Sequence, residues 1–310
     1  MNKIWDVLGV GCTTVDDLLY VAGYPPADAK TAVDRRERQC GGLAATALVA
    51  AARQGAGCAY AGALGHDEDS DFVRAALSEE GIDVSTSPRH PSAGPIHATI
   101  IVDQTAHTRN IFFLRPGVVG PLPAAPTDDQ VRAARVLFVD HYGGAETVRA
   151  QDLARGAGVP VVADLERDDV PEFDAILRRC DHLIVSERFA ARLCGDAGPA
   201  AAAAMLCADR DVVIVTSGAA GCWTIARGEA RAQRYAAFLV QVVDTTGCGD
   251  TFHGVYAAEL ARGAALPERV RRASAAAALK ATHYGAQKGI PTRAAVDQFL
   301  RERDQGVGVK

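Results

Sequence analysis

The stretch Asp244–Gly254, DTTGCGDTFHG, places a glycine-rich turn directly before a carboxylate and the start of a predicted helix. Glycines cost backbone entropy when they are ordered, so a run of them suggests a backbone that must approach another group closely. A carboxylate at a helix start is stabilised, because it faces the positive end of the helix dipole. The combination therefore points to a bound ligand at the first turn of this helix.

The chemistry of this turn suggests phosphoryl transfer. The N–H groups of Gly247, Cys248 and Gly249 precede the helix, where N–H groups and the dipole together favour an anion. A carboxylate beside a bound phosphate is repulsive unless it has a second task, and accepting the proton of an attacking hydroxyl is such a task. Asp250 is therefore the candidate general base, and the three N–H groups are candidate stabilisers of the transferred charge. A capped helix after a tight turn is the alternative without a function.

Apolar runs of strand length alternate with helical patterns along the chain. This alternation predicts an α/β fold, a doubly wound and mostly parallel sheet with helices on both faces. Ligands bind beyond the carboxyl ends of the strands in such sheets. The predicted strands are Trp5–Val10, Cys58–Ala63, Val136–Asp140, Val159–Ala163, His182–Ser186, Val212–Thr216 and Phe238–Val243, and the predicted helices are Gly41–Gly55, Ser70–Glu80, Asp250–Ala261 and Glu268–Thr282, of which the last two close the chain.

Two segments break this rhythm, because paired β-branched and aromatic runs follow each other with no helix between them. They cover residues 17–38 and 96–114 and predict a small β-sheet lid of antiparallel strands. A loop rich in proline and glycine, residues 115–127, leads back to the main sheet. The predicted α/β core therefore comprises residues 1–16, 39–95 and 115–310.

Composition argues against several classes of partner. The 310 residues are 48% hydrophobic and carry a net charge of −5, so there is no basic footprint for nucleic acid. No apolar run reaches the length of a membrane span, and the N-terminal residues predict a first strand rather than a signal peptide. The eight cysteines form no C-x-x-C pair and no zinc-ligand spacing, so we expect free thiols and a cytoplasmic protein.

Five motifs in this order resemble those of the ribokinase-like (PfkB) carbohydrate kinases, and the resemblance spans most of the chain. Residues 244–250 resemble the C-terminal family signature D-T-x-G-x-G-D, which implies that Asp250 is the base of an ATP-dependent sugar kinase. The implied fold is ribokinase-like, with a β lid that often pairs between the two subunits of a homodimer. The other four motifs are Gly41–Thr46 (GGLAAT), Gly62–Asp67 (GALGHD), Val215–Gly221 (VTSGAAG) and Gly285–Gln287 (GAQ).

The residues predicted to bind the sugar gather at strand ends and in the lid. Asp16 follows the first strand, where a carboxylate can accept two neighbouring hydroxyls, and the resemblance assigns it that role. Gly41 and Gly42 let a sugar lie against the backbone at a helix start. No G-x-x-x-x-G-K-[ST] is present, so a Walker-type phosphate loop is excluded. The full predicted set is Asp16, Lys30, Gly41, Gly42, Thr46, Arg109 and His141, with solvated surface charge as the alternative for Lys30 and Arg109.

The resemblance also implies a nucleotide site and cation sites. Asp244, Thr246 and Gly285 resemble the potassium site of the family, so ATP and Mg²⁺ are the implied cofactors and K⁺ is a candidate third. The chain departs from the family motif N-x-x-E, whose glutamate orders magnesium-bound waters, because Ser186 and Phe189 stand at its two positions. Either Glu187 or water and phosphate alone would then hold the magnesium. The predicted nucleotide-binding residues are Ser186, Glu187, Thr216, Ser217, Gly218, Gly221, Ser274 and Ala277.

Several residues around these sites resemble two branches of the family, the ketohexokinases and the sulfofructose kinases. Ketohexokinases and sulfofructose kinases also carry serine at the position of Ser186, and sulfofructose kinases share Thr46 and the D-x-F-H-G run that ends at Gly254. His141 stands where sulfofructose kinases have an arginine suited to an anionic oxygen. His253, within that run, is expected to pack in the core.

These patterns predict phosphorylation of the primary hydroxyl of a small sugar, a ketohexose or a relative, either neutral or anionic like sulfofructose. Lid closure would exclude water from the reaction. The exposed strand edges of the lid would suit a homodimer. A nucleoside kinase of the same family is one alternative. A sugar or nucleotide sensor without catalytic activity is the other, although such a binder has no use for the carboxylate of Asp250 beside phosphates.

Overall fold

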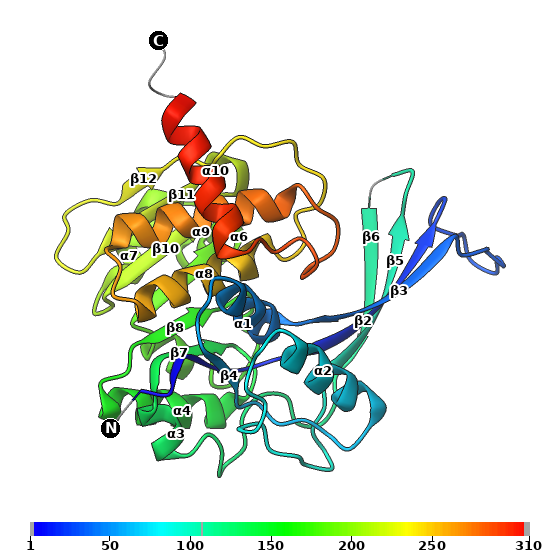
Figure 1. Cartoon of the computed structure of the whole chain (residues 1–310), viewed down its shortest axis with the longest axis horizontal. Coiled ribbons are helices and arrows are strands. Elements are labelled where there is room, and N and C mark those ends of the chain that lie inside the picture. Colours follow the sequence, from blue (N-terminus) through cyan, green and yellow to red (C-terminus); the bar gives the residue numbers. More distant parts are fainter. Residues whose placement is uncertain (1–2, 107, 307–310) are drawn as a thin grey trace.

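The computed structural model describes residues 3–106 and 108–306, and most of them surround one eight-stranded sheet (Figure 1). Its strand order is β12-β11-β10-β9-β8-β7-β1-β4. Neighbours from β4 to β10 run parallel, and β11 and β12 add antiparallel strands at one edge. The strands are β1 (Trp5–Val10), β4 (Cys58–Tyr60), β7 (Ala134–Asp140), β8 (Val161–Asp164), β9 (His182–Ser186), β10 (Val212–Thr216), β11 (Cys222–Ala226) and β12 (Gln233–Tyr235).

Helices cover both faces of this sheet. Each strand contributes side chains to both buried layers, because successive residues of a strand point to opposite sides. In β7, Val136 and Phe138 belong to one buried cluster, and Leu137 and Val139 belong to the other. The predicted doubly wound arrangement is therefore confirmed. The first cluster includes residues of α1 (Leu43–Arg53), α2 (Glu68–Glu79), α8 (Cys248–Ala261), α9 (Leu266–Ala281) and α10 (Arg293–Gly306), and the second includes residues of α3 (Asp128–Arg132), α4 (Gly144–Ala157), α5 (Phe173–Arg178), α6 (Glu187–Cys194) and α7 (Pro199–Cys207).

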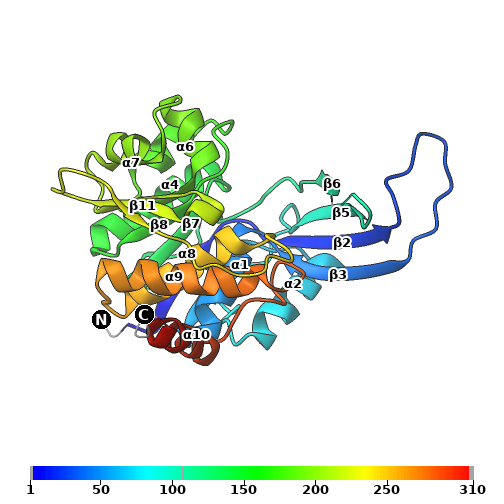
Figure 2. The same cartoon turned by 90° about the horizontal axis from the view of Figure 1, so that it is seen from above.

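A second sheet of four strands, which we call the lid, projects from the core in the order β3-β2-β5-β6 (Figures 1 and 2). The strands β2 (Thr14–Val21) and β3 (Arg35–Gly41) are antiparallel, as are β5 (Ile96–Asp103) and β6 (Thr108–Leu114). The two pairs meet through a parallel contact between β2 and β5. Asp16 pairs with Ala98 of β5, and Arg109 pairs with Val102 of the same strand. Ala98 and Val102 are four residues apart, so their side chains point to the same side of the sheet. The side chains of Asp16 and Arg109 therefore lie on one face of the lid.

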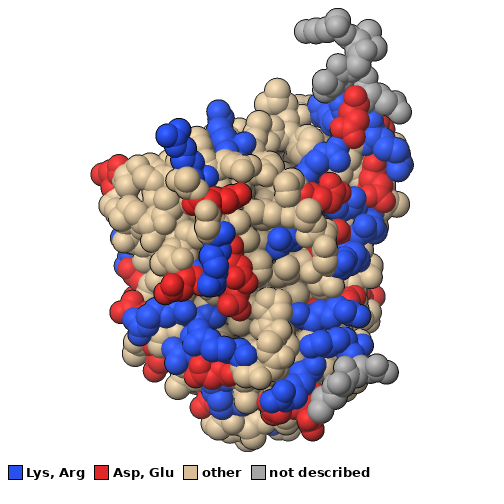
Figure 3. Space-filling model, turned by 90° about the vertical axis from the view of Figure 1, so that its left-hand side faces the viewer, with Lys and Arg blue, Asp and Glu red and all other residues tan. Residues whose placement is uncertain are grey.

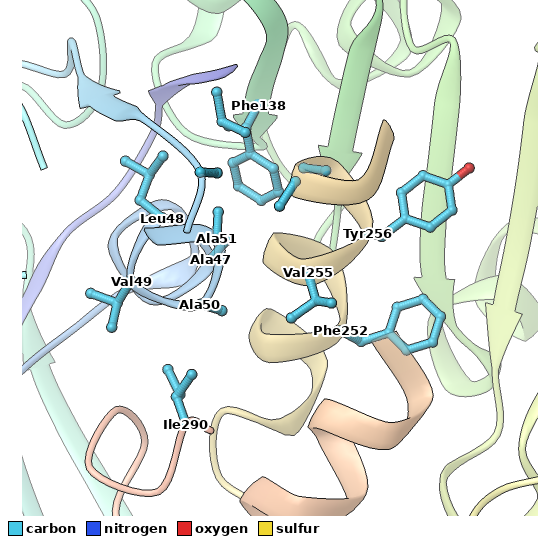
Figure 4. Close-up of a cluster of buried hydrophobic side chains, with 14 of the residues drawn as sticks. Ala47, Leu48, Val49, Ala50, Ala51, Phe138, Phe252, Val255, Tyr256 and Ile290 are labelled. Carbon is cyan, nitrogen blue, oxygen red and sulfur yellow. The ribbon is translucent and has the colours of Figure 1, made fainter. Parts of the chain in front are cut away.

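Helices α1 and α8 pack closely against each other within the buried core (Figure 4). Leu48 of α1 and Val255 of α8 lie in the same buried cluster. Gly254 makes the close approach possible, because a Cβ atom at this position would lie 2.0 Å from the carbonyl oxygen of Ala47. This contact fixes the first turn of α8 relative to the strand ends.

The structure corrects the sequence prediction in several places. Residues 238–243 are not a strand but an extended segment outside the sheet, with Leu239 81% exposed. Their apolar residues imitate a strand, but Phe238 and Val240 pack against the helix layer instead. The strands next to β10 at the edge of the sheet are β11 and β12, which the sequence did not predict. The last helix is α10 rather than the predicted helix that corresponds to α9. Strand β4 ends at Tyr60 rather than at residue 63.

The state of the cysteines and the distribution of surface charge can be compared with what the composition predicted. All eight cysteines are free thiols, as their spacing predicted, and six of them are buried. Across residues 3–106 and 108–306, no helix is both long enough and apolar enough to cross a bilayer. Acidic and basic side chains are interspersed over the face shown in Figure 3, so the charge of that face is mixed rather than of one sign.

Candidate active site

The glycine-rich turn has the two features that an anion site requires, a fixed backbone and open space. Gly247 is the N-cap of α8 with φ 77°, and a Cβ atom there would lie 2.6 Å from the carbonyl oxygen of Ala286, so only glycine fits. A Cβ atom at Gly249 would meet no protein atom within 4 Å. Within the described part of the chain, the N–H groups of Gly247 and Gly249 have no acceptor, whereas Cys248 N–H donates to the Thr245 carbonyl at 3.2 Å. The space beside Gly249 is therefore free for a ligand.

Asp250 lies in the first turn of α8 and hydrogen-bonds with the buried carboxyl group of Asp164, the last residue of β8. Burial raises the pKa of both carboxyl groups, and the charge of Glu166 raises both further. The charge of Asp164 also raises the pKa of Asp250. A hydrogen bond between two carboxyl groups requires a proton on one of them, so this pair shares a proton when it carries one negative charge. Sequence reasoning found Asp250 but missed Asp164, because only the fold joins the end of β8 to α8.

His253 completes this group, one helical turn beyond Asp250. Its Nδ1 lies 2.7 Å from the Gly249 carbonyl oxygen and its Nε2 lies 3.0 Å from the Ile184 carbonyl oxygen. Both ring nitrogens therefore face backbone carbonyl oxygens. Nδ1 also lies 3.4 Å from Asp164 Oδ2. His253 does pack in the core, as predicted, and the structure adds its contact with the carboxyl pair.

A second group of polar side chains lies where β7 ends. Asp140 is fully buried and accepts hydrogen bonds from the Cys12 N–H at 2.7 Å and the Tyr142 N–H at 2.8 Å, while burial raises its pKa to about 7. His141 is only 2% exposed, and burial lowers its pKa to about 4. Neither ring nitrogen of His141 has a hydrogen-bond partner among the described residues. A buried histidine without partners favours a polar ligand, so this geometry supports the predicted sugar contact.

The lid and α1 bring the other predicted sugar residues together. Asp16 is the third residue of β2 and is half-buried, and burial raises its pKa. A Cβ atom at Gly41 would lie 2.6 Å from Asp16 Oδ2, and one at Gly42, which has φ 98°, would lie 2.7 Å from the Cys12 carbonyl oxygen. Thr46 is buried in α1, and its hydroxyl oxygen accepts a hydrogen bond from Gln287 Nε2 at 3.2 Å. Gly41 thus keeps the space beside Asp16 free of side-chain atoms, and Gly42 lets the start of α1 pass close to the backbone after β1.

The two basic residues predicted in the lid have different positions. The Arg109 guanidinium donates to the Thr246 hydroxyl group, and its charge also acts on Asp16. Arg109 therefore connects the lid to the glycine-rich turn, close to both ends of the site. Lys30 is exposed in the 22–34 connection between β2 and β3, which extends from the far end of the lid (Figure 2). The structure does not bring Lys30 to the other predicted residues of the same chain.

The predicted nucleotide residues lie mostly around the turn after β10. Gly218 has φ 53° and Gly221 has φ 95°, and Ser217 N–H donates to the Gly221 carbonyl at 2.8 Å, so Thr216–Gly221 forms a tight turn. The Ser217 hydroxyl group is buried and has no partner among the described residues. Residues Ser274 and Ala277 follow on α9, and Ser274 hydrogen-bonds with Cys222, the residue after the turn.

At the position that differs from N-x-x-E, Ser186 and Phe189 do not offer a magnesium ligand. The Ser186 hydroxyl group caps α6 by accepting the Phe189 N–H at 3.2 Å, and Phe189 is buried against Phe173. Glu187 is exposed. No group of three or more acidic, histidine or cysteine side chains in residues 3–106 and 108–306 is arranged to hold a metal ion.

The three residues predicted to bind potassium lie together, but protein groups already use oxygen atoms of Asp244 and Thr246. Asp244 Oδ1 accepts the Thr246 N–H at 2.8 Å, and Asp244 Oδ2 accepts the Gly285 N–H at 2.9 Å. The Asp244 carbonyl oxygen accepts a hydrogen bond from Lys280 Nζ at 2.9 Å. The Lys280 ammonium group therefore already occupies an oxygen atom of the segment that was predicted to bind potassium. Sequence reasoning missed Lys280, which reads as an ordinary helix residue.

Comparisons with known proteins place the chain among the carbohydrate kinases. A family model described as pfkB family carbohydrate kinase matches residues 7–293. The ribokinase of Haemophilus influenzae is 29% identical over 272 residues, which cover 84% of this chain and 87% of that protein. A solved structure from Agrobacterium tumefaciens, of a protein provisionally named a ribokinase, has a TM-score of 0.90 at 29% identity and covers 97% of this chain and 99% of that one. Arabidopsis thaliana ribokinase complexed with ribose and ATP has a TM-score of 0.84 at 22% identity, over 97% of this chain and 99% of that one.

Proposed function

The chain belongs to the pfkB family of carbohydrate kinases and is an ATP-dependent sugar kinase, and we propose that it phosphorylates the primary hydroxyl group of a small sugar, a ketohexose or a close relative. One observation carries this proposal. Asp250 stands in the first turn of α8 beside the open space at Gly249, at the edge of the sheet where the strands end. A base and a phosphate site in contact are what phosphoryl transfer to an alcohol requires.

In this mechanism Asp250 accepts the proton of the sugar hydroxyl as its oxygen attacks the γ-phosphorus of ATP. A bond forms between that oxygen and phosphorus, the bond from phosphorus to the β,γ-bridging oxygen breaks, and ADP leaves with the electron pair. The N–H groups of Gly247 and Gly249 hold the charge of the transferred phosphoryl group. Magnesium, when bound with ATP, neutralises phosphate charge. Ser186 and Phe189 do not supply its ligands, so its shell would consist of phosphate oxygens and water, either alone or with the exposed carboxylate of Glu187.

The sugar would bind between the lid and the strand ends. We infer that Asp16 accepts two hydroxyl groups and that neutral His141 exchanges hydrogen bonds with a third, because its ring nitrogens have no partner among the described residues. Arg109 is the candidate contact for an anionic substituent. Ribose is the second candidate substrate, because the Haemophilus relative is a ribokinase. A nucleoside kinase and a non-catalytic sensor are the further alternatives that an experiment must separate.

The lid also supports a homodimer as part of this proposal. Strand β6 is the edge of the lid, and Ile111, Phe112, Phe113 and Leu114 are between 51% and 75% exposed. An exposed apolar edge strand is stabilised when a second copy covers it. Sedimentation velocity should show a dimer that Phe112→Asp weakens. The matched control is Met205→Asp on α7, which changes an apolar residue of similar exposure outside the lid. A monomeric wild-type protein at all concentrations would contradict the dimer.

The experiment that tests the function is ADP release by the purified protein with Mg²⁺ and a panel of acceptors. The panel contains fructose, fructose 6-phosphate, sulfofructose, ribose, 2-keto-3-deoxygluconate and adenosine. Turnover with a neutral ketose supports the proposal and makes Arg109 a lid contact only. Turnover with an anionic sugar alone assigns Arg109 to specificity, and turnover with ribose or adenosine alone replaces the ketohexose. Binding of a sugar without any ADP release would favour the sensor.

A further inference from the structure

Lys280 is a fully buried lysine in the last turn of α9, directly behind the glycine-rich turn. Its Nζ donates hydrogen bonds to the Asp244 carbonyl oxygen at 2.9 Å and to the His283 carbonyl oxygen at 3.3 Å. The Asp244 carboxylate lies 4.0 Å away. Lysine is rarely buried completely unless its charge is compensated, so this arrangement requires a reason.

The surroundings of Nζ are those of a bound monovalent cation. An ammonium group and a potassium ion are similar in size and charge, and both bind rings of carbonyl oxygens. The groups around Nζ come from the two segments predicted to bind potassium, the one that contains Asp244 and the one before Gly285. The hydroxyl group of Thr246, the third predicted ligand, is held by Arg109.

We propose that the Lys280 ammonium group is a built-in monovalent cation, which orders the turn before α8 and makes turnover independent of potassium. This inference rests on the proposed kinase function for its effect on rate, but not for its effect on cation binding. The charge of Lys280 also acts on Asp250 and Cys248, so it adds to the positive field at the phosphate site. Burial lowers the pKa of Lys280, and the neighbouring Asp244 carboxylate opposes that effect.

The first measurement is turnover of the wild-type protein in buffers of equal ionic strength that contain choline, sodium or potassium chloride. We expect the three rates to agree within about twofold, because the cation position is already filled. Strong stimulation by potassium alone would overturn the proposal. This measurement needs no variant, so it decides the question even where a variant does not fold.

The second measurement uses K280A, which removes the ammonium group and leaves room for an ion. In choline chloride we expect kcat to fall at least tenfold, roughly the effect of removing a group that stabilises transition-state charge. Potassium or ammonium chloride should restore part of the rate, whereas choline should not. The matched control is K288M. Lys288 lies eight residues beyond Lys280, but its side chain is exposed and pairs with Glu37 of β3. Wild-type turnover of K280A in choline would contradict the proposal.

A third readout is independent of catalysis. Potassium should raise the Tm of K280A above its value in choline chloride, because an ion that binds only the folded state stabilises it. The Tm of the wild-type protein should not differ between the two salts. A protein without kinase activity would refute the proposed function and would still give this result if Lys280 fills the cation position. A potassium-specific rise in the Tm of the wild-type protein would refute the proposal about Lys280.

Discussion

At the scale of single residues, the sharpest prediction concerns Asp250. The Asp250→Asn substitution removes the proton acceptor but leaves the N–H groups of the turn and the shape of the first helical turn in place. We expect kcat to fall by roughly 10²–10⁴-fold, the usual contribution of a positioned base. Sugar and ATP should bind with nearly unchanged affinity in calorimetry. Turnover of the variant at the wild-type rate would show that Asp250 is not the base.

A second prediction at this scale uses the carboxyl pair to shift a pH profile. Asp250 must be ionised to act, so kcat falls as the pH drops through its pKa, and Asp164 and burial hold that pKa well above the ordinary value. Asp164→Asn removes the repulsion and provides an amide donor, so the pKa of Asp250 falls. We therefore expect the acid limb of the kcat profile to move to lower pH.

The matched control for this shift is Asp168→Asn. Asp168 lies four residues beyond Asp164, in the segment after β8, and its carboxylate forms an ion pair with Arg192. Its profile should coincide with that of the wild type. An acid limb of Asp164→Asn that is unchanged or moves to higher pH would contradict the shared-proton pair.

The same residues show what a sequence can and cannot predict about the site. Asp250 could be found because its signal is local, a carboxylate directly after a run of glycines at a helix start. Asp164 and Lys280 could not, because each follows an ordinary apolar run and acts only through contacts between elements distant in the sequence. His253 was taken as packing because a sequence does not show that two backbone carbonyls will face its ring.

At the scale of elements, the contact of α1 with α8 makes a prediction about stability. In Gly254→Ala the new methyl group would lie 2.0 Å from the Ala47 carbonyl oxygen, so one helix must shift. We expect the free energy of unfolding to fall by about 1–3 kcal/mol, as for overpacked cores. Because α8 carries Asp250, kcat should fall as well. Urea unfolding and initial rates measure the two effects.

Gly156→Ala is the matched control for this substitution. Gly156 lies inside α4, and a Cβ atom there would meet nothing within 4 Å. Alanine is a better helix former than glycine, so this variant should be more stable than the wild type by about 0.5–1 kcal/mol. A Gly254→Ala protein as stable as the wild type would show that the helices can separate at no cost.

The elements that could be predicted are those whose pattern is complete within a short window. Strands β9 and β10 were placed at the correct residues, because each is a five-residue apolar run that the parallel sheet buries on both faces. The segment 238–243 has a similar composition but no strand to pair with, and only the assembled sheet shows this. The parallel contact between β2 and β5 joins segments some 80 residues apart, and their register depends on the fold.

At the scale of the whole molecule, the site is a set of charges that the sheet collects at one edge. The carboxyl groups of Asp140 and Asp164 stand at the ends of neighbouring strands β7 and β8, and α8 adds Asp250. Burial raises the pKa of all three. Such a cluster is unfavourable for folding when it is ionised, and the sharing of protons between its carboxyl groups reduces that cost.

This cluster determines how global stability depends on pH. A carboxyl group with a raised pKa binds its proton more tightly in the folded chain, so its contribution is lost as the pH rises through the folded value, about 7 for Asp140. His141 and His182 have lowered pKa values, about 4 and about 3, so they act in the opposite direction, but only below the ordinary histidine pKa of about 6.5. Above that pH these two histidines no longer oppose the carboxyl groups.

The free energy of unfolding should therefore decrease between about pH 6.5 and pH 8, by up to about 1.4 kcal/mol per pH unit for each proton held only by the folded chain. Urea unfolding at constant ionic strength measures this slope. In Asp250→Asn the slope should be smaller, because one titrating group with a raised pKa is lost. A stability that is flat or rises over this range would show that the three carboxyl groups are already ionised in the folded protein, and Asp250 would then act as a base without sharing a proton with Asp164.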